Sequence, residues 1–557
     1  MPERGSRVPA TTWRGVLTAD RTVFAIGLVL FVYAVASLFT MLDQSRTALI
    51  TADPYSYLLF AQELAHGHLQ MSGPLADAIA QFAETGELRQ GPIWNTNVLP
   101  DGGTIFTIAL GYPLFLSLAL QIGGTWLYTT VNVGLLLLVI LVLTWCTWVA
   151  WDRTLTGFLI GAAASILFVH THPATFLQFS NPWREPLFYI CVLGGAGGVM
   201  RFLACGRIRH LVLAGLLLGY SCAIKEANAI YTIWMGLYFL CSGAWRRHPR
   251  RYVALAVFAG CGLLGMAPLL VQNVVATGNP LLSTQFMRAT SNYGVQDVAA
   301  GLNQSNVGST FARYVFLYES LPAFQPWLLA IAGIGIGANL KRAGMRILLG
   351  VFVVHLALYL QWGNADFRHS FFAHIPYSVF VIAGLVWLLH LPLRRVSRLP
   401  CLRVWAALVP LIVLAFLPPP WPRDADRSGA FGHDDAEGLI EALSARIEPN
   451  SILLSNRVLR DVIGVYGPYP VLRLHELAAV HPAGDYQAVL DWLASRGHPA
   501  YFLDNRDLDP KNAGRIRWDK LEFRMLGDRF DLVPVLALNS RELNLRTMTA
   551  GEPLTVY

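Results

Sequence analysis

The stretch Thr51–Leu69, TADPYSYLLFAQELAHGHL, follows the first apolar run and stands in a long polar loop. Asp53 is suited to cap a helix that begins at Pro54, because proline at the first helical position lacks only an N–H that would have no partner there. Side chains that can lie on a membrane or protein face then recur at helical spacing: Tyr57, Phe60, Ala61, Leu64 and His68. Asp53 is therefore either only a helix cap or a catalytic carboxylate at the outer membrane surface, and topology decides.

The composition is that of an integral membrane protein. Of the 557 residues, 54% are hydrophobic, and the mean hydropathy is +0.46. Apolar runs long enough to cross a ~30 Å hydrocarbon core recur from Val23 to Leu417. The net charge of +7 does not indicate nucleic-acid binding, because most Arg and Lys residues lie in short clusters beside apolar runs. No metal-type Cys/His spacing occurs.

Apolar runs predict eleven membrane spans. Their approximate ranges are 23–42, 126–150, 156–171, 186–204, 211–226, 229–243, 252–275, 326–340, 347–362, 371–391 and 404–418. The run Thr104–Ile122 is not counted, because counting it would place the basic clusters RRHPRR and RRVSR outside, against the positive-inside rule. We expect it to be a re-entrant or interfacial segment supported by protein.

With the N-terminus inside, the unusual polar residues gather on the outer face. We expect a cytoplasmic tail (1–22), a polytopic domain (23–418) whose first outer loop is 43–125, and an extracytoplasmic C-terminal domain (419–557). The last should be a small α/β fold, since Ser451–Ser455 and Ala500–Leu503 resemble strands and Asp485–Arg496 resembles a helix. The outer face thus carries the functional signal.

Three further sets of charged residues fall at that face. Glu185 stands where the fourth span begins, which suits the helix dipole but is also ordinary anchoring. Lys225 and Glu226 lie in an apolar hairpin, where an ionisable pair is costly; it is either functional or a lysine that reaches the interface beside a compensating glutamate. Arg368 and His369 are basic residues outside the membrane, and an anion would explain their position.

These parts fit a transferase that works at the outer leaflet, where the donor sugar must be carried by a lipid such as polyprenyl phosphate. A carboxylate is needed to take the proton from an acceptor hydroxyl. Cations must offset the charge that collects on the departing phosphate. Asp53, Lys225 and Arg368 supply these groups on one face.

The order of landmarks resembles the GT-C superfamily of integral-membrane glycosyltransferases, near glycosyltransferase family 39 with its protein mannosyltransferases and aminoarabinose transferases. The segments that carry the resemblance are DPYSYLLFAQELAHG, GYPLFLSLAL, REPLFYI, AIKEANAIY and FRHSFFAHIP, in that order over about residues 20–395. The resemblance implies an all-α GT-C-like membrane domain and inverting transfer of a sugar from a polyprenyl-phosphate donor to a hydroxyl acceptor in a protein, lipid or polysaccharide.

By position, the resemblance makes Asp53 and Glu185 the catalytic acidic residues and Lys225 and Arg368 the groups near the donor phosphate. Tyr55, Tyr57, Tyr112 and His369 would line the substrate groove. Pro54 departs from the acidic or aromatic residue usual after the first acid, and the oligosaccharyltransferase signature WWD is absent. No D-x-D occurs in the first loop, so neither a metal nor a cofactor is expected.

Two other functions remain open. A transporter or lipid flippase would need internal repeats and charges near span midpoints, whereas no convincing repeat is found and the charges cluster at span ends. In a non-catalytic scaffold that presents the C-terminal domain, Asp53 and Lys225 would be dispensable. The glycosyltransferase is the preferred hypothesis, in the plasma or inner membrane.

Overall fold

A computed structural model describes most of the membrane domain and parts of the C-terminal domain. The described residues are 13–44, 52–82, 89–90, 95–99, 102–171, 179, 182–284, 326–360, 367–396, 402–417, 433–448, 451–454, 463, 469, 471–472, 486–495, 500–504, 526–538 and 554–556. Residues 1–12 of the expected cytoplasmic tail and most of the outer loop Asn273–Gln325 lie outside them, whereas residues 13–22 of that tail belong to the first helix.

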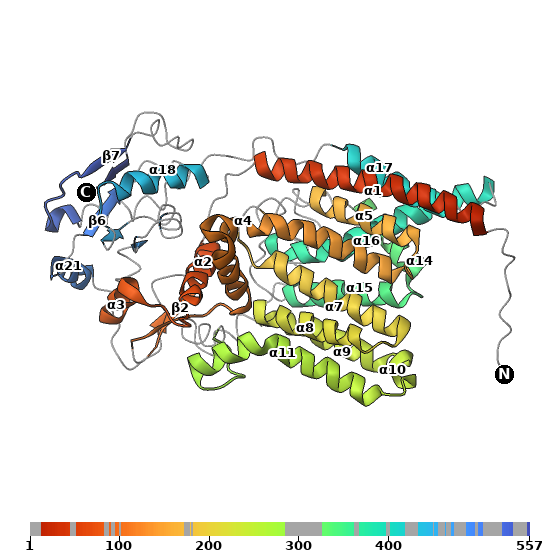
Figure 1. The fold of residues 1–557 in the computed structure, drawn as a ribbon, viewed down its shortest axis with the longest axis horizontal. Helices are drawn as coiled ribbons and strands as arrows, with labels where there is room; N and C mark the ends of the chain where they lie inside the picture. Colours follow the sequence, from red (N-terminus) through yellow and green to blue (C-terminus); the bar gives the residue numbers. More distant parts are fainter. Residues whose placement is uncertain are drawn as a thin grey trace.

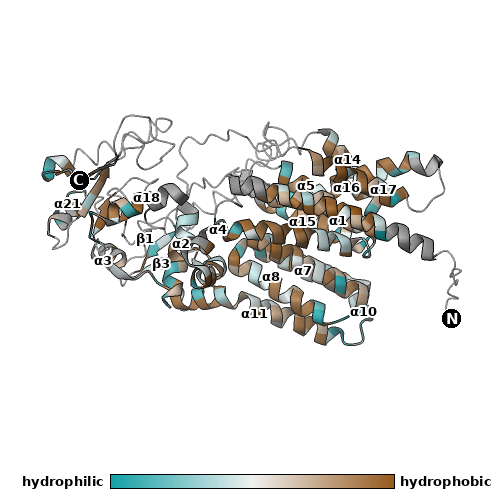
Figure 2. Ribbon diagram, turned by 45° about the horizontal axis from the view of Figure 1, so that its top comes forward, coloured by the Kyte–Doolittle hydropathy of each residue, from teal (hydrophilic) through white to brown (hydrophobic). Residues whose placement is uncertain are grey.

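Each of the eleven predicted spans falls on a helix of one bundle (Figure 1). The helices are α1 (Trp13–Gln44), α4 (Gly111–Ala150), α5 (Leu155–Thr171), α7 (Glu185–Cys205), α8 (Arg209–Ile224), α9 (Ala229–Cys241), α11 (Arg251–Thr277), α14 (Pro326–Asn339), α15 (Ala343–Leu360), α16 (Phe367–Val396) and α17 (Leu402–Phe416). By length and composition, five of the described helices could cross a membrane: those at Arg21–Phe39, Thr130–Ala150, Glu185–Cys205, Arg251–Thr277 and Phe372–Pro392. The predicted all-α polytopic domain is confirmed, and Figure 2 shows its helices to be predominantly hydrophobic.

Small residues let the helices approach closely. A Cβ atom added at Gly219 of α8 would lie 2.0 Å from the Gly262 carbonyl oxygen of α11. One added at Gly265 would lie 2.3 Å from the carbonyl oxygen of Leu216. In a lipid bilayer the hydrophobic effect does not drive helices together. Close van der Waals packing at small residues such as these glycines stabilises their association instead.

The basic loops gather at one end of the bundle. Arg342 Nη1, between α14 and α15, lies 2.7 Å from Asp152 Oδ2, between α4 and α5. His248 Nε2, near the start of α11, is 2.9 Å from the Gly206 carbonyl oxygen after α7. These contacts agree with the prediction that the loops share one side. Figure 1 places α10 (Gly243–Arg247) at that end and α2, β2 and the C-terminal elements at the other.

The run Thr104–Ile122 divides between a strand and a helix. The small antiparallel sheet β1 (Arg89–Gln90), β2 (Thr96–Val98) and β3 (Thr104–Phe106) contains its first residues. Helix α4 begins at Gly111 but breaks at Gly124, where φ is 63° and ψ is −163°. This run is thus no single spanning helix, as charge predicted.

Helix α2 (Ala52–Ala65) begins earlier than the sequence indicated. Asp53 lies inside the first turn of α2 and is therefore not its capping residue. The predicted helix start at Pro54 is wrong by two residues, which is about the difference found between methods that define helix ends. Tyr57, Phe60 and Ala61 of the predicted apolar face are buried. Helix α2 ends at Ala65, however, so His68, which was expected to continue that face, lies beyond the helix and is exposed. Helix α3 (Gly73–Phe82) follows α2 in the chain.

The C-terminal part is a mixed α/β unit, as predicted. Its sheet has the order β5-β4-β6-β8-β7, from strands β4 (Ile452–Leu454), β5 (Val471–Leu472), β6 (Ala500–Asp504), β7 (Leu536–Leu538) and β8 (Leu554–Val556). Strand β4 pairs in parallel with β5 and β6, and β8 pairs antiparallel with β6 and β7. Helices α18 (His433–Ser444) and α21 (Tyr486–Ser495) accompany the sheet.

Candidate functional site

Polar and aromatic side chains meet at the end of the bundle opposite the basic loops. Tyr57 of α2 and Tyr112 of α4 pack edge to face, with ring centroids 5.4 Å apart. Both rings are buried. This contact joins the Thr51–Leu69 stretch to the start of α4, so two of the predicted groove residues are brought together. Tyr55 is buried on the same helix.

A buried ion pair forms the centre of the cluster. Lys225 Nζ lies 3.8 Å from Glu185 Oε1, although the two residues stand forty positions apart in the chain. Glu185 is 5% exposed and Lys225 9% exposed. Burying two charges is costly and breaking such a pair leaves an uncompensated charge. The sequence predicted both residues as functional, and the structure brings them together.

The position of Lys225 follows from the shortness of its hairpin. Helix α8 has 16 residues and α9 has 13, so at ~1.5 Å per residue they extend about 24 and 20 Å, less than a ~30 Å hydrocarbon core. The turn between them includes the 3-10 helix η2 (Glu226–Asn228). Asn228 Nδ2 closes this turn by donating to the Ser221 carbonyl oxygen at 2.8 Å. Lys225 is thereby held inside the bundle.

Arg184 adds a second cation that the sequence analysis did not assign to the site. Its Nε lies 4.0 Å from Glu185 Oε1, and its guanidinium carbon lies 5.6 Å from the centroid of the Tyr57 ring. The residue precedes α7, whose first turn carries Glu185. Arg184 therefore links the glutamate to α2.

Glu226 does not compensate Lys225, as one reading of the hairpin supposed. Its carboxylate accepts a hydrogen bond from Ser283 Oγ, after α11. The partner of Lys225 is Glu185 instead, so the site holds two carboxylates with different surroundings.

Tyr112 is fixed by a short chain of hydrogen bonds. Its hydroxyl donates to Asn132 Oδ1 at 2.9 Å, and Asn132 Nδ2 donates to the Trp183 carbonyl oxygen at 2.6 Å. Burial, with the nearby Tyr57 and Glu185, raises the pKa of Tyr112 well above its usual value. The phenol therefore stays protonated and serves as a hydrogen-bond donor, not as a base.

The segment before α4 is anchored from α11. Gln272 Nε2 donates to the Ile108 carbonyl oxygen at 2.7 Å, and its Oε1 accepts from the Leu110 backbone N–H at 2.8 Å. Asn132 and Gln272 are polar residues within long apolar helices. This feature of the sequence could have identified them as candidate site residues.

The backbone also brings positions 53, 368 and 369 to this end. Position 53 lies one helical turn before Tyr57, and residues i and i+4 share a helix face. Position 368 lies one turn before Phe372, whose ring centroid is 5.3 Å from that of Phe188. Lys225 Nζ in turn lies 6.0 Å from the Phe188 centroid. The side chains of Asp53, Arg368 and His369 are outside the described residues.

Among the side chains that the structure describes, no group of three or more His, Cys, Asp and Glu residues is arranged to hold a metal ion. The cations of the described cluster can bind an anion, and its carboxylates can accept a proton. It lies beside the start of α2, where position 53 stands.

Comparisons with known proteins identify the fold. No family model matches the sequence, and no curated protein matches it. Among solved structures, ArnT from Cupriavidus metallidurans bound to undecaprenyl phosphate matches with a TM-score of 0.53 at 12% identity, over 98% of each chain. The apo state of the same ArnT matches with a TM-score of 0.53 at 13% identity, over 95% of this chain and 97% of that one. The predicted GT-C-like fold is therefore confirmed over nearly the whole chain.

Proposed function

We propose that this protein transfers a sugar from a polyprenyl-phosphate donor to a hydroxyl acceptor, with inversion, at the outer face of the membrane. The observation that carries the proposal is the buried Glu185–Lys225 pair, 3.8 Å apart, at the end of the bundle that also holds the start of α2. The fold is shared with an ArnT that was crystallised with undecaprenyl phosphate, which makes a lipid-linked donor the natural choice.

In the proposed reaction the acceptor oxygen attacks the anomeric carbon of the sugar from the face opposite the phosphate. The bond between that carbon and the phosphate oxygen breaks, and the phosphate leaves with the electron pair. Lys225 and Arg368 stabilise its negative charge. Asp53 takes the acceptor proton as general base. Tyr112, whose pKa is raised by burial, is proposed as a hydrogen-bond donor to the substrates and not as the base.

Glu185 is the second acidic residue of the proposed site. In the absence of donor it balances the charge of Lys225 and, at 4.0 Å, that of Arg184. A donor phosphate would compete with Glu185 for the ammonium group. Before the donor binds, the glutamate keeps both cations near the place of the leaving group, so that little reorganisation accompanies the reaction.

Tyr55, Tyr57, Tyr112 and His369 are proposed to line the groove for the substrates. The C-terminal α/β unit, at the same end of the molecule in Figure 1, is proposed to be extracytoplasmic and near the acceptor. The basic loops lie together at the opposite end of the bundle, and the positive-inside rule assigns that end to the cytoplasmic side of a plasma or inner membrane. This grouping supports an extracytoplasmic position for the C-terminal unit.

The test is sugar transfer by purified protein in liposomes, with a panel of radiolabelled polyprenyl-phosphate sugars. Asp53→Asn should lower transfer by at least about a hundredfold, the scale of general-base catalysis, with unchanged expression and folding. The exposed Asp77 of α3 gives the matched control, and Asp77→Asn should keep full activity. Full activity of Asp53→Asn, or no transfer from any lipid-linked donor by the wild type, would contradict the proposal.

A further inference from the structure

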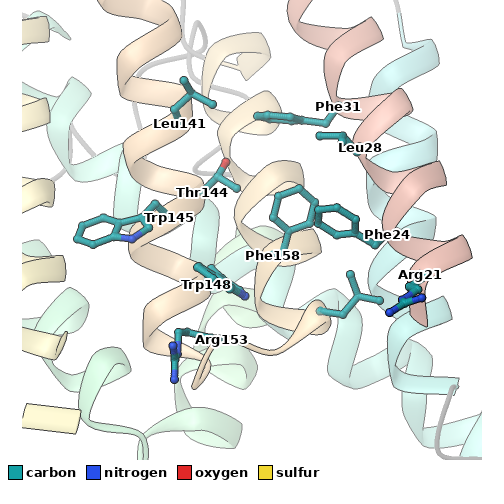
Figure 3. Close-up of a pocket in the computed structure, with 11 residues that line it drawn as sticks. Arg21, Phe24, Leu28, Phe31, Leu141, Thr144, Trp145, Trp148, Arg153 and Phe158 are labelled. Atoms are coloured by element: carbon teal, nitrogen blue, oxygen red, sulfur yellow. The ribbon is translucent and has the colours of Figure 1, made fainter. Parts of the chain in front are cut away.

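A second feature lies away from the candidate site: an apolar groove between α1, α4 and α5 (Figure 3). Its cavity volume is about 720 Å³. The lining is almost wholly apolar and includes Phe24, Leu28, Leu141 and Phe158. Phe24, Leu28 and Leu141 are each 40–44% exposed, so the groove opens sideways on the outside of the bundle.

The groove belongs to the end of the bundle that carries the basic loops. Trp148, which lines it, is sixteen residues beyond Asn132 on the unbroken part of α4, or about 24 Å along the helix axis. Asn132 is the residue that holds Tyr112 in the candidate site. That separation is most of a ~30 Å hydrocarbon core, so the groove faces the opposite leaflet.

Two arginines stand at the charged end of the groove. Arg21 comes from the start of the first candidate span, and Arg153 from the turn after α4; Figure 3 shows both at the lower end of the apolar lining. Both are exposed, and neither makes an ion pair with a described residue. The neighbouring carboxylate, that of Asp152, forms an ion pair with Arg342, whose Nη1 lies 2.7 Å from Asp152 Oδ2.

The backbone holds Arg153 in an unusual conformation. Its φ is 62° and that of Asp152 is 55°, two successive non-glycine residues in the left-handed region. This turn separates the two charges, because Asp152 reaches Arg342 while Arg153 lines the groove.

We propose that this groove binds an anionic phospholipid of the leaflet at the basic end, with an acyl chain along Phe24, Leu28 and Leu141 and the phosphate between Arg21 and Arg153. Apolar lining suits the chain, and two cations at membrane-interface depth suit the head group. Trp145 and Trp148 are the aromatic residues that favour this depth. The site is separate from the proposed donor site and does not depend on the proposed reaction.

Native mass spectrometry of the purified full-length protein, titrated with phosphatidylglycerol or phosphatidylcholine, tests the head-group part. Arg21→Gln with Arg153→Gln should weaken phosphatidylglycerol binding about thirtyfold, since each of the two arginines near an anionic head group contributes about 1 kcal/mol. Phosphatidylcholine binding should hardly change. The control, Arg207→Gln with Arg209→Gln, removes the same charge from the same end but not from the groove, and should bind as the wild type does.

Leu141→Trp tests the acyl-chain part by filling the groove while keeping both arginines. It should lower the stoichiometry of tightly held phosphatidylglycerol by one molecule. Leu138→Trp, at a residue 45% exposed on the same helix but outside the lining, should not. Unchanged phosphatidylglycerol binding in both groove variants would overturn the proposal, as would displacement of the lipid by polyprenyl phosphate but not by other anionic phospholipids.

Discussion

At the scale of single residues, charge placement defines the candidate site. Glu185 and Lys225 can be predicted from the sequence, because each is an ionisable group at the edge of an apolar segment. Their contact with one another cannot, because a forty-residue separation gives no information on distance. The neighbouring Glu226 is the obvious partner for Lys225 in the sequence, whereas in the structure the short turn directs Glu226 to Ser283.

At the scale of elements, the start of α4 must lie against the end of α8. A Cβ atom added at Gly111 would lie 2.6 Å from the carbonyl carbon of Ala223, two residues before Lys225. The Tyr220 hydroxyl donates to the Gly111 carbonyl oxygen at 2.7 Å and fastens the same contact. Only glycine permits this approach, so Tyr112 and Lys225 depend on it for their positions.

Gly111→Ala should lower sugar transfer by up to about a hundredfold, because small misplacements of reacting groups have effects of that size. Gly134→Ala, on the same helix with no atom within 4 Å of the added Cβ, should leave transfer unchanged. The assay is transfer in liposomes, with Tm as a check on folding. Equal activity of the two variants would contradict a positioning role for Gly111.

Hydropathy and positive charge sufficed to place the spans, since each predicted span falls on a helix. They also sufficed to exclude Thr104–Ile122 from the membrane spans. Counting this run as a span would have placed the later basic loops on the outer side. Hydropathy could not predict the break at Gly124 or the anchoring of the preceding segment by Gln272, because both depend on tertiary contacts. The start of α2 was misplaced because Pro54 is compatible with any position in a first helical turn.

At the scale of the whole molecule, the proposed function requires the two ends of the bundle to face opposite compartments. Native Cys205, exposed at the basic end, should react with a membrane-impermeant thiol reagent only after the cells are permeabilised. Asp77→Cys, in exposed α3, should react in intact cells. Mass spectrometry of labelled peptides locates the reaction. Labelling of Cys205 in intact cells would invert the proposed orientation.

The affinity of the purified protein for polyprenyl phosphate, measured for Lys225→Gln and Glu185→Gln side by side, shows whether the buried pair binds the donor. If Lys225 binds the donor phosphate in competition with Glu185, Lys225→Gln should weaken binding about tenfold or more, as expected for losing a charge-assisted contact. Glu185→Gln should preserve or strengthen it. Equal losses in both variants, or unchanged binding by Lys225→Gln, would contradict the claim that this buried pair forms the donor site.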